Sequence, residues 1–380
     1  MKQTARIIST YSADVFGVCS ALFELGGMVI MHDASGCNST YTTHDEPRWY
    51  DMESMVYISG LTEMEAIMGD DEKLISDIVA AAEDLKPRFI AVAGTPIPTM
   101  TGFDFQAAAE LIEQRTGIPA FGFPTTGMNS YVKGASMAFE ALAERFVEKP
   151  FEKTAAPSAN ILGLTPLDFT VNGSDAAIAG FVEEAGFSVL SRWAMGSTLE
   201  DLAKAGGAHV NLVVSSTGLA AAEKLRQLFG TPYVVGVPMG AEFSALLRSA
   251  LKTAAATGET QFPACSLAGG ETLVIGEAVT SVSLASALEL STGKAVRVVC
   301  PTEVTEGILR EKDIPVTCEE EIDEAAAGAA CIIADPLFKP ICPAGARFVR
   351  LPAESFSGRI WRQEIPNLIA NFDDFAKEVL

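Results

Sequence analysis

The chain has 380 residues, of which 48% are hydrophobic and 20% are charged, and its 49 acidic and 27 basic residues give a net charge of -22. This length is too great for one hydrophobic core, and the composition excludes a disordered or fibrous protein. The negative charge disfavours polyanionic partners, so we expect binding neither to nucleic acid nor to an anionic membrane.

The amino-terminal segment has no basic region followed by a long apolar one, and no run approaches the roughly 20 apolar residues of a membrane span. We therefore expect a cytoplasmic protein. Its seven cysteines lie at irregular intervals, unlike the framework of a small secreted disulfide protein, so we expect reduced thiols.

Apolar segments of strand length alternate with amphipathic segments of helical length along the chain. The predicted strands are 28–31, 89–93, 120–123, 160–164, 210–214, 233–237, 272–275, 296–299 and 332–334. The predicted helices between them include 71–85, 105–114, 175–185, 219–228 and 282–290. Strands that are hydrophobic on both faces and are followed by helices are typical of a parallel sheet covered on both sides. The pattern therefore predicts an α/β protein of several doubly wound units.

Two polar, proline-bearing stretches divide this pattern into three parts. Residues 148–160 (EKPFEKTAAPSAN) and 257–271 (TGETQFPACSLAGGE) each follow a helical pattern and precede a new strand, as linkers do. We therefore predict three Rossmann-like domains, at residues 1–155, 156–265 and 266–380, each of ordinary domain size.

The loops that follow the predicted strands are the candidate sites, because ligands bind at the carboxyl ends of strands in open α/β sheets. In the cleft between domains, a cofactor or small ligand could contact the following loop residues: Ser215, Ser216, Thr217, Gly240, Glu242 and Glu277. The alternative is that these residues cap helices. Neither a Walker A motif nor a G-x-G-x-x-G after a strand occurs, so we expect no nucleotide site in this chain.

The loop after the first predicted strand, HDASGCNSTYTTHDEPRW at 32–49, contains two of the three histidines of the chain. One hypothesis is a metal or cluster site formed by Cys37, His32, His44 and Asp45, because thiolate, imidazole and carboxylate groups are the usual metal ligands. The alternative is a structural loop in which Cys37 packs at a subunit contact and the charged residues form ion pairs.

Two further residues have simpler interpretations. Cys19 lies on the apolar face of a helical pattern that begins after Ser12, and we expect it in the core. His209 precedes the strand 210–214, and we expect a hydrogen-bonded structural histidine.

Several segments repeat the order and spacing of a known superfamily. They are H-x-x-x-G-C at 32–37, LTEMEAIMGDDEKL at 61–74, GTPIPTMTGFD at 94–104, IPAFGFPTTGMNSYVKG at 118–134, AHVNLVVSSTGLAAAEKLRQLFGTPYVVGVPMG at 208–240, GGETLVIGEAVTSVSLASALEL at 269–290 and LPAESFSGRIW at 351–361. Together they resemble the nitrogenase component 1 superfamily, which includes the subunits of dark-operative protochlorophyllide reductase.

The resemblance implies three Rossmann-like domains per subunit and a homodimer or a pair of homologous subunits. It also implies an iron-sulfur metallocluster near the subunit interface and electrons from a separate ATP-hydrolysing P-loop iron protein. Such clusters are usually held by four thiolates. Cys37 stands at one of the family's cysteine positions. The resemblance places two others near Tyr11 or Ser12 and near Thr95, and a cofactor ligand at Val214 or Ser215, but there is no cysteine at these positions.

We therefore predict an oxidoreductase subunit that reduces a small substrate with electrons from an iron protein. Nitrogen reduction itself is not expected, because the cofactor cysteine is missing. The alternative prediction is a non-catalytic scaffold or binding protein for a metallocofactor or an organic ligand, which the loss of cysteine ligands favours.

Overall fold

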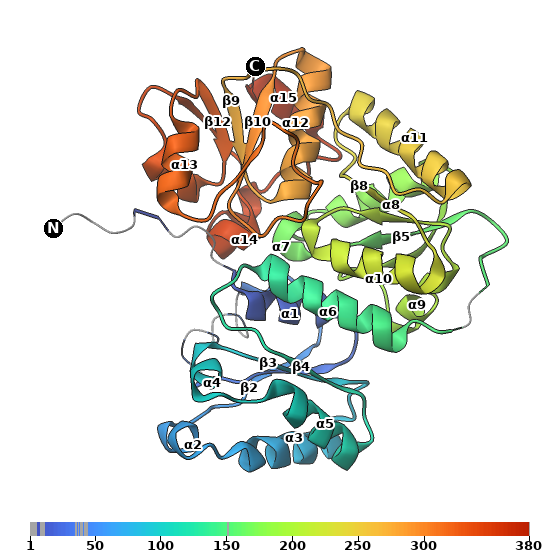
Figure 1. Cartoon of the computed structure of the whole chain (residues 1–380), viewed down its shortest axis with the longest axis vertical. Helices are drawn as coiled ribbons and strands as arrows, with labels where there is room; N and C mark the ends of the chain where they lie inside the picture. Colours follow the sequence, from blue (N-terminus) through green and yellow to red (C-terminus); the bar gives the residue numbers. More distant parts are fainter. Residues whose placement is uncertain are drawn as a thin grey trace.

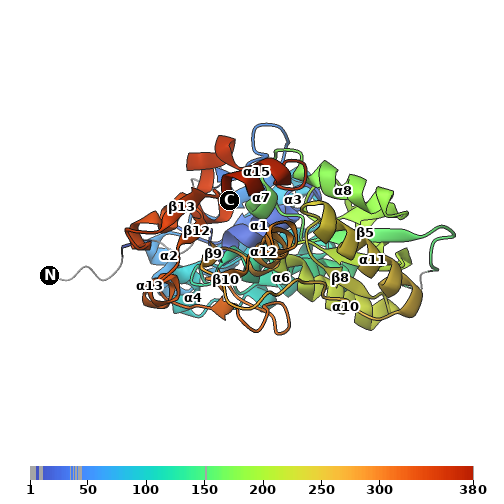
Figure 2. The same cartoon turned by 90° about the horizontal axis from the view of Figure 1, so that it is seen from above.

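The computed structural model describes residues 6–7, 12–34, 36, 38, 41, 45–149 and 152–379. These residues form three sheets in which the strands run parallel, and helices cover each sheet. The unit around the first sheet lies at one end of the molecule, and the units around the other two lie side by side at the opposite end (Figures 1 and 2). The predicted class, α/β with three Rossmann-like parallel-sheet units, is confirmed.

The first sheet has the strand order β2-β1-β3-β4. Its strands are β1 at Met28–Met31, β2 at Met55–Ile58, β3 at Ile90–Ala93 and β4 at Ala120–Phe123. Its helices are α1 at Asp14–Leu22, α2 at Glu63–Met68, α3 at Asp71–Leu85, α4 at Pro96–Thr101, α5 at Phe105–Thr116 and α6 at Tyr131–Phe146. Alternate strand residues point to opposite faces. Met28 and Ile30 therefore pack toward α3 and α5, while Val29 and Met31 join the core on the side of α1 and α6.

Helices α1 and α6 cross at very close range in the middle of the molecule. A side chain at Gly134 of α6 would place its Cβ 1.8 Å from the backbone oxygen of Asp14 in α1. Glycine at this position therefore permits the close crossing. Because α6 also packs against α10, it connects the first unit to the second.

The second sheet has the strand order β6-β5-β7-β8. Its strands are β5 at Ser158–Leu162, β6 at Ser188–Arg192, β7 at Val210–Val213 and β8 at Tyr233–Val235. Its helices are α7 at Pro166–Phe169, α8 at Ser174–Glu184, α9 at Leu199–Ala203, α10 at Leu219–Phe229 and α11 at Ala241–Thr257, with short 3-10 turns at Ala205–Gly207 and Ser216–Gly218.

The third sheet has the strand order β11-β10-β9-β12-β13. Its strands are β9 at Thr272–Ile275, β10 at Val296–Cys300, β11 at Ile314–Pro315, β12 at Cys331–Ala334 and β13 at Arg347–Arg350. Its helices are α12 at Ala278–Thr292, α13 at Glu319–Ala326, α14 at Glu354–Ser357 and α15 at Phe372–Val379, with 3-10 helices at Pro336–Ile341 and Gly358–Glu364. Within the described ranges, no helix combines the length and the apolar character needed to cross a membrane.

The carboxyl-terminal segment returns from the third unit to the second. The side-chain amide of Asn172 donates a hydrogen bond to the backbone oxygen of Ile365 at 3.1 Å. Further along, the ring of Phe372 lies 2.8 Å from the position that a Cβ on Gly240 would take. These contacts fix the second and third units around the space between them.

Candidate functional site

The carboxyl ends of strands from the second and third sheets face a common pocket. Strand β9 lies at the centre of the third sheet. The next strands in the chain, β10 and β11, lie on one side of it, and the later strands β12 and β13 lie on the other. Such a reversal leaves a crevice at the carboxyl ends of the two strands where it occurs. Gly276 and Glu277 directly follow β9, Asp335 directly follows β12, and all three line the pocket.

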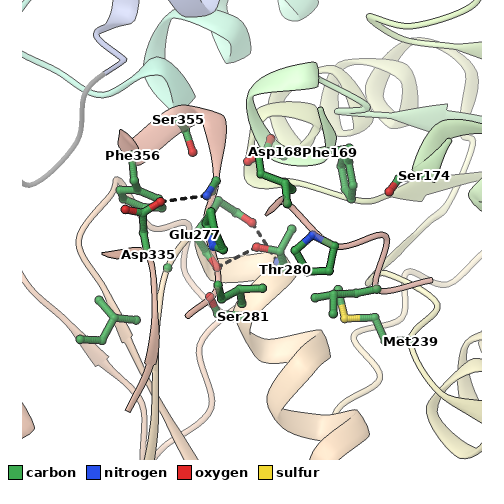
Figure 3. Close-up of a pocket in the computed structure, with 18 of the residues that line it drawn as sticks. Asp168, Phe169, Ser174, Met239, Glu277, Thr280, Ser281, Asp335, Ser355 and Phe356 are labelled. Atoms are coloured by element: carbon green, nitrogen blue, oxygen red, sulfur yellow. Dashed lines mark hydrogen bonds between the residues drawn. The ribbon is translucent and has the colours of Figure 1, made fainter. Parts of the chain in front are cut away.

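The pocket has about 680 Å³ of empty space, part of it open to solvent. One part of its wall is apolar and consists of Phe169, Met239, Ile275, Leu351, Pro352, Phe356, Ile365, Pro366, Leu368 and Ile369. The polar part consists of Asp168, Ser174, Glu277, Thr280, Ser281, Asp335 and Ser355. In Figure 3, Asp168 and Phe169 lie on the side of the second unit, opposite Glu277, Thr280 and Ser281 of the third.

Glu277 is the amino-terminal cap of α12. Its carboxylate accepts hydrogen bonds from the backbone nitrogens of Val279 at 3.0 Å and Thr280 at 2.9 Å. It also accepts hydrogen bonds from the backbone nitrogen of Ser216, at 3.0 Å, and from the Ser216 hydroxyl. Backbone N–H groups at a helix amino terminus favour a negative charge. Glu277 therefore fixes the loop after β7 to the helix after β9.

Asp168 lies in α7, which begins at Pro166 after the cap residue Thr165. Its carboxyl group accepts hydrogen bonds from the Thr165 hydroxyl, at 2.8 Å, and from the Tyr131 hydroxyl. Burial, together with the negative charge of Glu277, raises the pKa of Asp168 to about 7, although these hydrogen bonds act in the opposite direction. A carboxyl group of this kind can donate or accept a proton near neutral pH.

Asp335 and Ser281 complete the polar part of the wall. The Asp335 carboxylate accepts hydrogen bonds from the backbone nitrogens of Leu337 at 2.8 Å and Ala353 at 2.9 Å. Burial raises the pKa of Asp335. Ser281 is only 4% exposed, and its hydroxyl has no hydrogen-bond partner in the described part of the chain. This hydroxyl is therefore available to a molecule in the pocket.

The pocket contains one of the six residues predicted to contact a cofactor or ligand, and the other five do not line it; Glu242 is exposed in the first turn of α11. Glu277 lines the pocket. Ser215, Ser216 and Thr217 are buried behind Glu277 and Asp168, and Ser216 bonds directly to Glu277. Gly240 caps α11. Glu277 caps a helix, as one of the two sequence interpretations predicts, and it also lines the pocket, so its contact with a ligand stays a prediction.

The residues of the predicted metal site lie away from this pocket or outside the described residues. Cys37 and His44 lie outside the described residues. The Nδ1 atom of His32 lies 2.8 Å from the Ser59 hydroxyl, and burial lowers the pKa of His32 to about 4. Asp45 lies 4.0 Å from the Arg359 guanidinium. Within the described ranges, no three His, Cys, Asp or Glu side chains form a group that could hold a metal ion, so the four-residue site remains a prediction.

The end of the 32–49 loop is held by buried ion pairs. The Arg48 guanidinium lies 2.6 Å from Glu46 and 3.0 Å from Glu24, and it donates a hydrogen bond to the backbone oxygen of Ala194 at 2.8 Å. These ion pairs agree with the structural interpretation of this part of the loop. They also fix the loop against the second unit.

The cysteines of the described residues do not line the pocket. Cys19 is fully buried in the main core, as predicted, and burial raises its pKa. Burial also raises the pKa of Cys300 to about 12. Because the polar wall offers carboxyl and hydroxyl groups and no thiolate, it does not fit an iron-sulfur cluster held by cysteine.

His209 is a structural residue, as predicted. Its Nδ1 atom accepts a hydrogen bond from the backbone nitrogen of Ser158 at 3.3 Å.

Three parallel α/β units, with a pocket at strand ends between the second and the third, define the class of this protein, and comparisons with known proteins identify its family. Residues 14–264 match the family described as nitrogenase component 1 type oxidoreductase. The chain belongs to this family.

Curated relatives match part of the chain. A subunit of the light-independent protochlorophyllide reductase of Nostoc punctiforme is 29% identical over 185 residues, which are 45% of this chain and 36% of that protein. The corresponding protein of Dinoroseobacter shibae is 38% identical over 97 residues, which are 25% of this chain and 18% of that protein. Each match therefore spans well under half of the relative's length.

Two solved structures support the fold across the whole chain. The structure described as nitrogenase Cp1 at pH 6.5 has a TM-score of 0.69 and 16% identity, and it covers 100% of this chain and 94% of that one. The structure at pH 5 has a TM-score of 0.67 and also 16% identity, with coverages of 100% and 89%. At this identity the similarity establishes the fold alone.

Sequence reasoning did not single out Asp168 or Ser281. Asp168 follows Thr165-Pro166 in a T-P-x-D segment, which has the spacing of a helix cap and its N3 acid. That pattern indicates a helix start at a strand end, which places the acid near the ligand crevice. Ser281 gives no signal in the sequence, since serines inside a helix are common.

Proposed function

We propose that the chain is a subunit of a nitrogenase component 1 type oxidoreductase that binds a small organic substrate in the interdomain pocket and supplies a proton from Asp168. The proposal rests on the position and the pKa of this carboxyl group. Asp168 lines the pocket, and its pKa is about 7. Reduction of an organic molecule consumes protons as well as electrons, and a general acid acts best when its pKa is near the working pH.

Electron delivery by a separate ATP-hydrolysing iron protein, and pairing with a second subunit, are parts of this proposal. An exposed apolar surface on α2 and α4 supports a protein partner. Met64, Ile67 and Met68 of α2 are 69%, 71% and 73% exposed, and Met100 of α4 is 86% exposed. The two helices are neighbours in the first unit. Large exposed apolar residues that lie together mark surfaces that bind other proteins.

The test of the partner is direct binding to an iron protein from the same organism, measured by biolayer interferometry under anaerobic conditions with a non-hydrolysed ATP analogue. We expect Met68→Glu to weaken this binding about tenfold or more, since it places a charge in an apolar contact. The matched control is Leu85→Glu, an exposed apolar residue of α3. Equal binding by wild type and Met68→Glu would contradict this role of the surface.

An iron-sulfur cluster at Cys37 is a separate part of the proposal and needs its own test. We expect anaerobically purified protein to contain iron and sulfide and to give an electron paramagnetic resonance signal when reduced. Both should be lost in Cys37→Ala and kept in Cys318→Ala, which removes an exposed cysteine of the third unit.

The second candidate function is a non-catalytic binding or scaffold protein for an organic ligand or a metallocofactor. It is favoured by the chemistry of the polar wall, which has carboxyl and hydroxyl groups but no thiol. A colourless protein without iron that still binds an organic molecule in the pocket would support this alternative over the first.

A further inference from the structure

We infer that the interdomain pocket selects a small organic cation, such as a protonated amine with an apolar body. This inference deepens the proposed function, because it names the class of ligand for the same pocket, and it rests on that pocket being the ligand site.

The first observation is the sign of the charges in the pocket wall. The ionisable groups that line it are Asp168, Glu277 and Asp335, and no lysine, arginine or histidine of the described residues lines it. Two of these carboxyl groups hold fixed positions through backbone hydrogen bonds. A cavity lined by one sign of charge attracts ligands of the opposite sign. The pocket therefore disfavours phosphates and carboxylates.

The charge of Arg350 acts on Asp335 and lowers its pKa, against the larger effect of burial, but each arginine near the pocket also has an acidic partner of its own. Arg362 pairs with Glu354 of α14 and also donates a hydrogen bond to the backbone oxygen of Asp45 at 2.7 Å. Arg350 lies 2.8 Å from Glu364, and its guanidinium stacks on the Trp361 ring at 4.2 Å. The acidic wall is thus left for a cation supplied by the ligand.

The second and independent observation is the hydroxyl of Ser281. This residue is only 4% exposed, lines the pocket, and has no hydrogen-bond partner for its hydroxyl among the described residues. The Ser281 hydroxyl oxygen is not among the fully buried side-chain atoms without a partner, so it is open to the pocket, where a ligand or water can satisfy it. A hydroxyl oxygen can accept a hydrogen bond from an ammonium group.

The acceptor atoms of the carboxylates also have room for such a donor. An ionised carboxylate oxygen accepts about two hydrogen bonds. Glu277 Oε2 accepts one, from Thr280, and Asp335 Oδ1 accepts one, from Leu337. A divalent metal ion fits less well, because it needs several carboxylates within about 2.5 Å, and no such group exists in the described part of the chain. The apolar wall suits the hydrocarbon part of an organic cation instead.

The charge selectivity is tested with three probes of one shape: benzylammonium, benzyl alcohol and benzoate. Binding to the purified full-length protein is measured by isothermal titration calorimetry at pH 7.5. We expect benzylammonium to bind about tenfold or more tighter than benzyl alcohol, because a charge-assisted hydrogen bond is the stronger one, and benzoate to give no binding. Tighter binding of benzoate or benzyl alcohol, binding of calcium in place of benzylammonium, or no binding by any probe at millimolar concentration would overturn the inference.

Variants of α12 locate the binding. Ser281→Ala should weaken benzylammonium binding about three- to tenfold, which is the contribution of one hydrogen bond, and Ser281→Phe should abolish it by filling the pocket. Ser291→Ala, an exposed serine of the same helix, is the matched control and should bind like wild type. Equal binding of benzylammonium by Ser281→Phe and wild type would mean that the probe binds outside this pocket, and would overturn the inference.

These measurements need neither an iron protein nor a cluster. A protein that binds benzylammonium selectively but lacks reductase activity would contradict the proposed oxidoreductase function and leave the inference intact. A protein that contains iron and sulfide but prefers benzoate would contradict only the inference.

Discussion

The Tyr131 hydroxyl donates a hydrogen bond to the Asp168 carboxyl group and so joins the first residue of α6 to α7. Tyr131 is fully buried, and burial raises its pKa well above the usual value, so the phenol keeps its proton and remains a donor. This contact between the first unit and the pocket acid therefore joins a neutral hydrogen-bond donor to a carboxyl group whose charge changes near neutral pH.

Replacing Tyr131 by phenylalanine removes this donor. A hydrogen bond to an ionised acceptor contributes about 1.5–3 kcal/mol, and one to a neutral acceptor about 1 kcal/mol. We therefore expect Tyr131→Phe to lower the free energy of unfolding more at pH 8.5, where Asp168 is ionised, than at pH 5. Urea denaturation at the two pH values measures this, with Tyr57→Phe, a partly exposed tyrosine of β2, as the control. An equal loss at both pH values would contradict the role of the Asp168 charge.

The raised pKa of Asp168 predicts a pH dependence of stability with a definite sign. The folded protein holds this proton up to pH about 7, while the unfolded chain releases it near its ordinary pKa of 3.8. The folded state therefore binds more protons in this window, and stability falls as the pH rises from about 4 to 7.

Asparagine at position 168 removes this titration and keeps a similar shape. One pKa unit corresponds to about 1.4 kcal/mol, so the stability of Asp168→Asn relative to wild type should rise by at least about 1 kcal/mol between pH 5 and pH 8. The groups that act on Asp168 are Glu277, Tyr131, Ser215 and Thr165, and they are present in both proteins. Urea denaturation measures the difference, and Asp373→Asn on the exposed side of α15 is the control. A difference that is constant with pH would show an ordinary pKa for Asp168.

The sequence predicts the central strands of the three sheets and misses most of the edge strands. Each of the nine predicted strands overlaps an observed one, because continuous apolar runs mark strands that are buried on both faces. The strands without a prediction are β2, β6, β11 and β13, and all four lie at sheet edges. Tyr57 of β2 and Arg347 of β13 are exposed, so their strands mix polar and apolar residues and resemble loops in the sequence.

The candidate site could be predicted only in part, because its residues come from distant parts of the chain. Glu277 directly follows a predicted strand, and the rule that ligands bind at strand ends was enough to find it. Asp168, in contrast, has a raised pKa because it is buried and because it lies near the negative charge of Glu277, a residue that follows a strand of a different sheet. Tertiary packing, which no local pattern records, creates this property.

His32 offers a test of the first unit by nuclear magnetic resonance. Its pKa is lowered to about 4 by burial, while the unfolded chain has an ordinary value of 6.5. Below pH 6.5 His32 is therefore protonated in the unfolded state but not in the folded state. The free energy of unfolding falls for this reason as the pH falls from 6.5 toward 4.

We expect the ring signal of His32 to remain that of a neutral imidazole at pH 5.5, where an exposed histidine is protonated. A His32→Gln variant identifies the signal and should also lose less stability between pH 7 and pH 5 than wild type. A midpoint of titration near 6.5 would mean that the ring is solvated and free to bind a metal ion from solution.

The crossing of α1 and α6 can be tested with a pair of helical glycines. A Cβ at position 134 would lie 1.8 Å from the backbone oxygen of Asp14, and backbone cannot move away as a flexible side chain can. Gly180 of α8 has no atom within 4 Å of the corresponding position. We expect Gly134→Ala to lower the free energy of unfolding by about 3 kcal/mol or more through overpacking. Gly180→Ala should instead raise it by about 0.5–1 kcal/mol, because alanine favours a helix. Thermal and urea unfolding of both variants measure the two effects, and a Gly134→Ala protein as stable as wild type would mean that the two helices lie further apart than the structure has them.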